Sequence, residues 1–120
     1  ILLINLDVKS NAKNDLVLLC IHGYPISSYD WYKVWPDLKL NFNRIIAPDL
    51  LGFGFSDKPV CQINLLNLLI IFIFSYLMFI TKEQADLIED LLKYLNIKTV
   101  HILSHDYGDS VIQELLARKK

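Results

Sequence analysis

The ten residues from Thr99 to Gly108, with the sequence TVHILSHDYG, decide the fold of this 120-residue chain. Thr99 to Leu103 combine apolar and β-branched residues, which predicts a short strand. Ser104 to Gly108 turn the chain sharply, and residues 109–119 have the spacing of a helix. Because small residues flank the turn, it can be tight, and we expect Asp106 at its apex to stand exposed above a sheet.

The rest of the chain alternates in the same way. The sequence predicts further strands at residues 1–8, 16–21 and 44–48, and a helix at 81–96. The run at 16–21, LVLLCI, has no polar alternation, as expected of a strand covered on both faces of a parallel sheet. This alternation predicts an α/β fold with a mostly parallel sheet flanked by helices.

The predicted helices have recognisable boundaries. Ser27 and Ser28 are suitable N-caps for a short helix, which Pro36 is expected to interrupt or kink. Thr81 and Gln84 form a T-x-x-Q pair, which predicts a capping box at the start of the helix at 81–96.

Composition excludes several classes of protein. Twelve basic and thirteen acidic residues leave a net charge of −1, which gives no general electrostatic case for a nucleic-acid partner. Cys20 and Cys61 are too few for a disulfide scaffold and are interpreted as reduced apolar residues, with one bridge left open. No cluster of Cys, His, Asp and Glu has the spacing of a metal site, and no cofactor is expected. The chain starts at Ile1 rather than Met and shows no signal-peptide pattern, and we expect it to be a fragment.

Asp106 is a candidate nucleophile. The helix that follows directs its free N–H groups and the positive end of its dipole toward the turn, which stabilises a carboxylate there as an anion. The alternative is that Asp106 simply caps the helix, a common role for Asp.

A second turn, His22-Gly23-Tyr24-Pro25, follows the apolar strand at 16–21. Gly permits unusual backbone angles and Pro fixes the exit, so the turn can direct the Tyr24 N–H toward a developing oxyanion. The Tyr107 N–H would be the second donor. The alternative is an ordinary turn between a strand and a helix.

The loop from Leu50 to Pro59 carries Gly52 and Gly54. A third glycine is missing and no helix clearly opens there, so we do not expect a dinucleotide site. A shaped surface loop is the better interpretation.

Together these motifs resemble the α/β-hydrolase fold family, in the branch of epoxide hydrolases and haloalkane dehalogenases that use an Asp nucleophile. The resemblance rests on the two turns and on DLLGFGFSDKP at 49–59, LSHDYGD at 103–109 and QELL at 113–116. It covers residues 1–59 and 81–120. It implies that the chain is the N-terminal part of that fold, truncated after the helix that follows the Asp106 turn.

The resemblance also implies residue roles. Asp106 would attack an epoxide, halide or similar small electrophile, such as an ester, to give an alkyl-enzyme ester. The Tyr24 and Tyr107 N–H groups would form the oxyanion hole. The residues that would shape the two turns are His22, Gly23, Pro25, Ser104 and Gly108.

In this family the acid and the His follow the nucleophile, whereas no His follows Asp106 here, and the lid is also missing. We therefore expect no turnover from this chain alone. His22 is expected to play a structural part, His101 to be a core or sheet-edge residue, and His105 to point away from the attack site. Ser104 and Ser110 are not at the apex, which disfavours a serine esterase.

Residues 60–80 do not fit the pattern, because Ile63 to Ile80 carry no charge. Three interpretations stay open: a near-complete membrane span, a buried helix or hairpin, and translated non-coding sequence from a gene-model error. A membrane span would favour a membrane-associated or interaction fragment over an enzyme. The resemblance implies a location at the endoplasmic reticulum membrane, and the cytoplasm is expected otherwise.

Overall fold

A computed structural model describes residues 3–9, 14–58 and 71–118, and describes residues 3–6 and 71–80 by their backbone alone. Four strands form one sheet in the order β1-β3-β2-β4. They are β1 (Leu3–Lys9), β2 (Val17–Ile21), β3 (Arg44–Asp49) and β4 (His101–Ser104). β2 runs parallel to both β3 and β4, whereas β1 runs antiparallel to β3. The prediction of a mostly parallel sheet is confirmed for the strands that lie next to the two turns.

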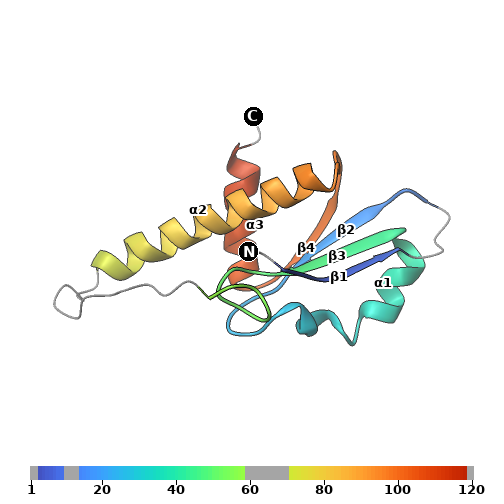
Figure 1. The fold of residues 1–120 in the computed structure, drawn as a ribbon, viewed down its shortest axis with the longest axis horizontal. Coiled ribbons are helices and arrows are strands. Elements are labelled where there is room, and N and C mark those ends of the chain that lie inside the picture. Colours follow the sequence, from blue (N-terminus) through green and yellow to red (C-terminus); the bar gives the residue numbers. More distant parts are fainter. Residues whose placement is uncertain (1–2, 10–13, 59–70, 119–120) are drawn as a thin grey trace.

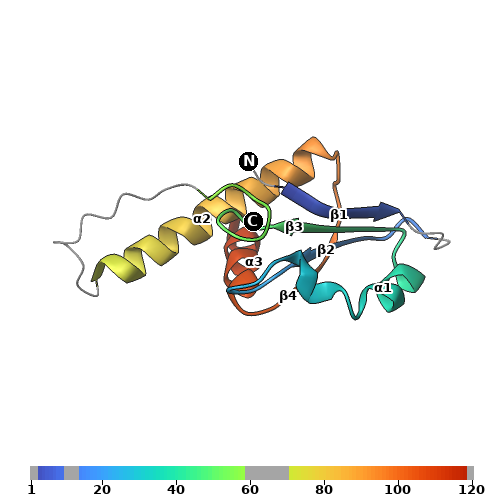
Figure 2. The same cartoon turned by 60° about the horizontal axis from the view of Figure 1, so that its bottom comes forward.

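Helices cover both faces of this sheet (Figures 1 and 2). The 3-10 helix η1 (Ser28–Trp31) and helix α1 (Trp35–Asn41) lie on one face. The long α2 (Ile71–Tyr94) and α3 (Tyr107–Arg118) lie against each other on the opposite face. The yellow N-terminal end of α2 extends beyond the sheet and α3 in both views.

Two apolar clusters hold the layers together, one on each face of β2 and β3. Leu19 and Ile21 of β2 pack with the helices α2 and α3, together with residues such as Ile88 and Val111. Leu18 and Cys20 point the other way; their cluster is completed by Trp31, Trp35, Ile45 and Ala47. Successive strand residues face opposite sides, so the uninterrupted apolar run predicted a strand covered on both faces, and this is confirmed. Burial raises the pKa of the Cys20 thiol to about 12, so it stays neutral and apolar.

Three predictions about element boundaries are wrong. Pro36 does not interrupt a helix but lies in the first turn of α1, where its missing N–H leaves no hydrogen bond unmade. The strand predicted from Thr99 begins at His101, where its pairing with Leu18 of β2 starts.

The predicted capping box is the third error. Thr81 lies inside α2, which begins ten residues earlier at Ile71, so it caps nothing. The buried Gln84 side chain instead binds the loop after β3. Its Oε1 accepts from the Leu51 N–H at 2.9 Å and its Nε2 donates to the Leu51 carbonyl at 2.7 Å.

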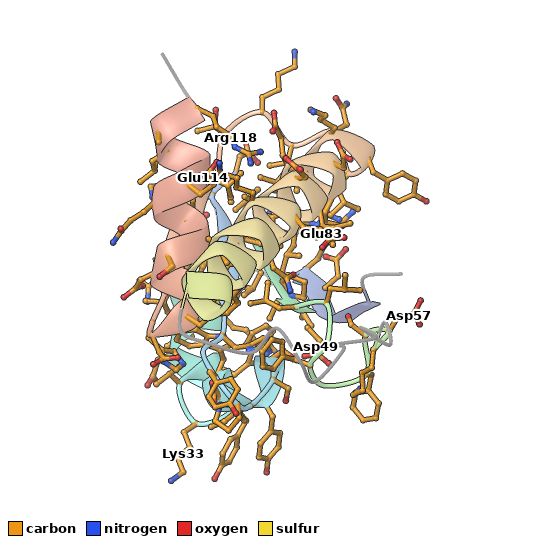
Figure 3. The ribbon with its side chains drawn as sticks, turned by 90° about the vertical axis from the view of Figure 1, so that its left-hand side faces the viewer. Lys33, Asp49, Asp57, Glu83, Glu114 and Arg118 are labelled. Carbon is orange, nitrogen blue, oxygen red and sulfur yellow. The ribbon has the colours of Figure 1, made fainter. Side chains whose placement is uncertain are left out.

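The far end of α2 behaves as predicted. Asn96 adopts a left-handed φ of 54°, and its N–H and that of Ile97 return to carbonyls of the last helical turn. Arg118 of α3 ties the two helices together, binding Glu114 of its own helix and Asp86 of α2 (Figure 3).

Within residues 3–9, 14–58 and 71–118, no helix is both long and apolar enough to cross a bilayer. Residues 63–70 of the hydrophobic segment and Cys61 lie outside the described residues. The interpretations of residues 60–80 as an insertion or as a gene-model error stay hypotheses.

Candidate functional site

The two predicted turns meet at one edge of the sheet. β2 and β4 are neighbours and parallel, so the turns that follow them both lie beyond the carboxyl ends of these strands. In open α/β sheets this is the edge where ligands bind.

The turn after β4 is a tight elbow with Asp106 at its apex. Asp106 has a φ of 54°, a left-handed conformation that a non-glycine residue rarely adopts. The helix α3 begins at Tyr107, two residues before the predicted start. Its first turn is already formed at the elbow, because the Gly108 N–H donates to the His105 carbonyl at 3.0 Å.

Gly108 lets the elbow approach β2. A Cβ at this position would lie 2.7 Å from the carbonyl oxygens of both Ile21 and His22, closer than real carbon atoms come. Ser104, before the apex, donates its hydroxyl to the Asp109 carboxylate at 2.6 Å. Gly108 thus allows close packing against β2, and Ser104 connects the end of β4 to the first turn of α3.

The turn after β2 is held by a buried histidine. The Leu50 N–H donates to Nε2 of His22 at 2.9 Å, so Nδ1 carries the proton and donates to the Gly23 carbonyl at 2.8 Å. These two bonds require a neutral ring. His22 is fully buried, and the Tyr24–Pro25 peptide of the same turn is cis. The expectation of a structural hydrogen-bonding role for His22 agrees with this geometry.

Backbone N–H groups from both turns stabilise the charged Asp106 carboxylate. The Tyr24 N–H donates to its Oδ1 at 2.7 Å, across 82 residues of sequence. The Tyr24 and Tyr107 backbone N–H groups, in that order of importance, hold the pKa of the exposed Asp106 carboxyl below its ordinary value. The side chain thus serves a contact between the turns, because the Asp109 N–H that a cap would bind goes to the Asp106 carbonyl instead.

Aromatic rings from the two turns pack against Phe53. Phe53, from the loop after β3, lies edge-on to Tyr24 with ring centroids 6.0 Å apart and edge-on to His22 at 5.5 Å. It also meets the Tyr107 ring at 6.2 Å. Burial raises the pKa of the Tyr107 phenol, so it is neutral near pH 7.

The side chain of Asp49, labelled in Figure 3, holds the loop that carries Phe53 in place. This fully buried carboxylate accepts from the Ser28 N–H at 2.8 Å and from the Phe55 N–H at 2.9 Å. A Cβ on Gly54 would collide with the same carboxylate, so glycine is required there. Sequence reasoning missed the roles of Asp49 and Phe53, although an Asp directly after a buried strand was an available signal.

The other two histidines do not touch the Asp106 carboxylate. His101 is exposed on β4, the last strand of the described sheet, and its ring tilts against Phe42. His105 points toward η1, where its Nε2 lies 3.0 Å from Oδ2 of Asp30. Among the described residues no group of His, Cys, Asp or Glu could hold a metal ion.

A family model described as the alpha/beta hydrolase fold matches residues 17–119. The chain is 47% identical over 106 residues to a mesoderm-specific transcript homolog protein from Bos taurus, covering 87% of this chain and 27% of that protein. It is 33% identical over 94 residues to a soluble epoxide hydrolase from Corynebacterium, covering 78% of this chain and 27% of that one.

Solved structures agree. A loop variant of a haloalkane dehalogenase from Bradyrhizobium elkanii superposes with a TM-score of 0.66 at 30% identity, covering 94% of this chain and 32% of that one. The chain thus spans about a third or less of the length of these relatives. The match over residues 17–119 includes both turns and the elbow helix, and the chain belongs to the α/β-hydrolase fold family.

Proposed function

We propose that Asp106 is the nucleophile of a hydrolase that acts on small electrophiles such as epoxides or alkyl halides. The observation that carries this proposal is the hydrogen bond from the Tyr24 N–H to the Asp106 carboxylate, at a left-handed elbow whose Tyr107 N–H also stabilises that charge. Relatives named as a soluble epoxide hydrolase and a haloalkane dehalogenase support the substrate class.

In the first step an Asp106 oxygen attacks the electrophilic carbon. Since Oδ1 is held by the Tyr24 N–H, we assign the attack to Oδ2. A carbon–oxygen ester bond forms, and either the carbon–halogen bond breaks to release halide or the epoxide C–O bond breaks to leave an alkoxide that takes a proton from solvent. A depressed pKa suits this role, because it keeps Asp106 ionised at neutral pH.

In the second step water adds to the ester carbonyl carbon. Oδ1 is then the carbonyl oxygen, and negative charge develops where the Tyr24 N–H already lies, with the Tyr107 N–H of the elbow proposed as the second donor. Donors placed in advance stabilise this charge without reorganisation. Collapse of the intermediate releases the alcohol and regenerates the carboxylate.

The second step also needs a base to activate the water. None of the chain's three histidines is placed for it: His22 has both ring nitrogens engaged, His105 faces Asp30, and His101 lies against Phe42. We therefore expect the alkyl-enzyme ester to accumulate in this chain rather than turn over.

Intact-mass spectrometry after incubation with 1-bromohexane or styrene oxide tests the proposal. We expect one added hexyl group, or one added epoxide, mapped by peptide sequencing to Asp106. The Asp106→Asn variant should lose the adduct, whereas Asp90→Asn, which removes an exposed carboxylate on α2, should keep it. An adduct that persists in Asp106→Asn, or none in the parent chain, would reject Asp106 as the nucleophile.

A further inference from the structure

His105, the neighbour of Asp106 in the elbow, makes a second connection, to the segment that follows the Tyr24 turn. Its Nε2 lies 3.0 Å from Oδ2 of Asp30, whose side chain is only 14% exposed. The His105 ring also lies edge-on to the buried Trp31, with centroids 5.3 Å apart. Asp30 and Trp31 belong to η1, the segment that follows the Tyr24 turn. The contact therefore joins elements 75 residues apart.

Gly23 passes between the two side chains of the elbow. A Cβ on Gly23 would lie 2.6 Å from Cβ of Asp106 and 2.9 Å from Cε1 of His105. The turn after β2 is thus in close contact with both His105 and Asp106. Because Gly23 directly precedes Tyr24, a shift of the elbow against this turn would change the distance from the Tyr24 N–H to the carboxylate.

The bond to Tyr24 needs such support. Asp106 is exposed and holds a strained left-handed φ, and a residue in that conformation persists when its surroundings over-determine it. A single hydrogen bond that competes with water contributes little by itself. The bond to Asp30 is better shielded, and His105 can donate from Nε2 whether its ring is neutral or charged.

We propose that His105 and Asp30 form a positioning pair, which holds the elbow against the Tyr24 turn and so keeps the Tyr24 N–H within hydrogen-bond distance of the Asp106 carboxylate. The contribution of this pair to catalysis rests on the proposed function. The geometry that it maintains is measurable without any turnover.

The full chain labelled with ¹⁵N-tyrosine provides the readout. Tyr24 and Tyr107 report on the carboxylate, and Tyr94, at the end of α2, reports on overall folding. In Asp30→Ala and His105→Leu we expect the Tyr24 amide proton to shift upfield and to exchange with solvent about tenfold faster, because its bond to Oδ1 is lost for much of the time. The Tyr94 amide should stay unchanged.

Conservative and matched variants separate positioning from general stability. His105→Gln keeps an N–H that can reach Asp30 and should restore the Tyr24 signal most of the way. His101→Leu on β4 and Asp37→Ala on α1 remove similar groups elsewhere and should leave it unchanged. If Asp30→Ala does not fold, Asp30→Asn keeps the shape, weakens the bond, and should give a smaller shift in the same direction.

Two results would overturn the proposal. One is an unchanged Tyr24 amide in His105→Leu and in the Asp30 variant that folds. The other is equal acceleration at Tyr24 and Tyr94, which would show loss of stability alone. Failure of Asp106 to form an ester would leave these amide measurements intact, so the two proposals fail separately.

Discussion

The two turns at the carboxyl edge of the sheet meet at one carboxylate but are built differently. The turn after β2 is buried around His22 and contributes a backbone N–H, that of Tyr24. The turn after β4 is exposed and strained at its apex and contributes a side chain, that of Asp106. A backbone donor places no demand on the residue type, whereas a carboxylate acceptor does. The chain therefore specifies one turn through the residues that support it, and the other through the residue at its apex.

The largest expected effect comes from separating the turns. Gly108→Ala places a Cβ 2.7 Å from two backbone carbonyl oxygens that cannot move aside. We expect the free energy of unfolding, measured by urea denaturation, to fall by about 3 kcal/mol, as for an overpacked core site.

Gly52→Ala is the matched control for Gly108→Ala. Gly52 has a positive φ of 92°, but nothing lies within 4 Å of its missing Cβ. We expect only the cost of the left-handed conformation, about 1 kcal/mol. Equal losses in the two variants would show that close packing between the turns is not what Gly108 provides.

Removing the buried histidine should be next in size. His22→Leu leaves the Leu50 N–H and the Gly23 carbonyl without their partners in a buried turn. We expect a loss of about 2–3 kcal/mol in urea denaturation, because each unsatisfied buried group costs a substantial part of its desolvation. His101→Leu, at an exposed ring, should change stability by less than about 0.5 kcal/mol. A His22→Leu chain as stable as His101→Leu would contradict the structural role of His22.

The smallest effect is expected at the opposite edge of the sheet. Arg44, at the start of β3, binds both carboxylate oxygens of Asp7 at 2.7 and 2.8 Å. This bond lowers the pKa of Asp7, so its stabilisation is present above the unfolded value of about 3.9 and is lost as the pH falls through the lower folded value.

Because the Asp7–Arg44 pair is partly exposed, we expect Asp7→Asn to cost less than about 1 kcal/mol at neutral pH, with no change at the Tyr24 amide. Urea denaturation at two salt concentrations measures this cost. A larger loss, or a shift at Tyr24, would show that the two edges of the sheet are coupled.

The sequence predicted the turns and strands that depend on neighbouring residues. Small residues around Asp106 and the Gly-Tyr-Pro after His22 marked both turns, and the apolar run of β2 marked a strand covered on both faces. Contacts that depend on packing between distant segments were missed, such as that of His105 with Asp30. Gln84 shows how a local signal misleads. Its T-x-x-Q spacing fits a capping box, but its amide binds Leu51, 33 residues away.

The central claim is that backbone N–H groups of both turns stabilise the Asp106 carboxylate. A pH titration of the ¹⁵N-tyrosine-labelled chain tests it directly through the Tyr24 and Tyr107 amide protons. Because both N–H groups stabilise the charged form, we predict that the two signals titrate together, with a midpoint below the ordinary Asp value of about 3.9, and that neither titrates in Asp106→Asn. Amide signals with separate midpoints, or a common midpoint at or above the ordinary value, would contradict the account.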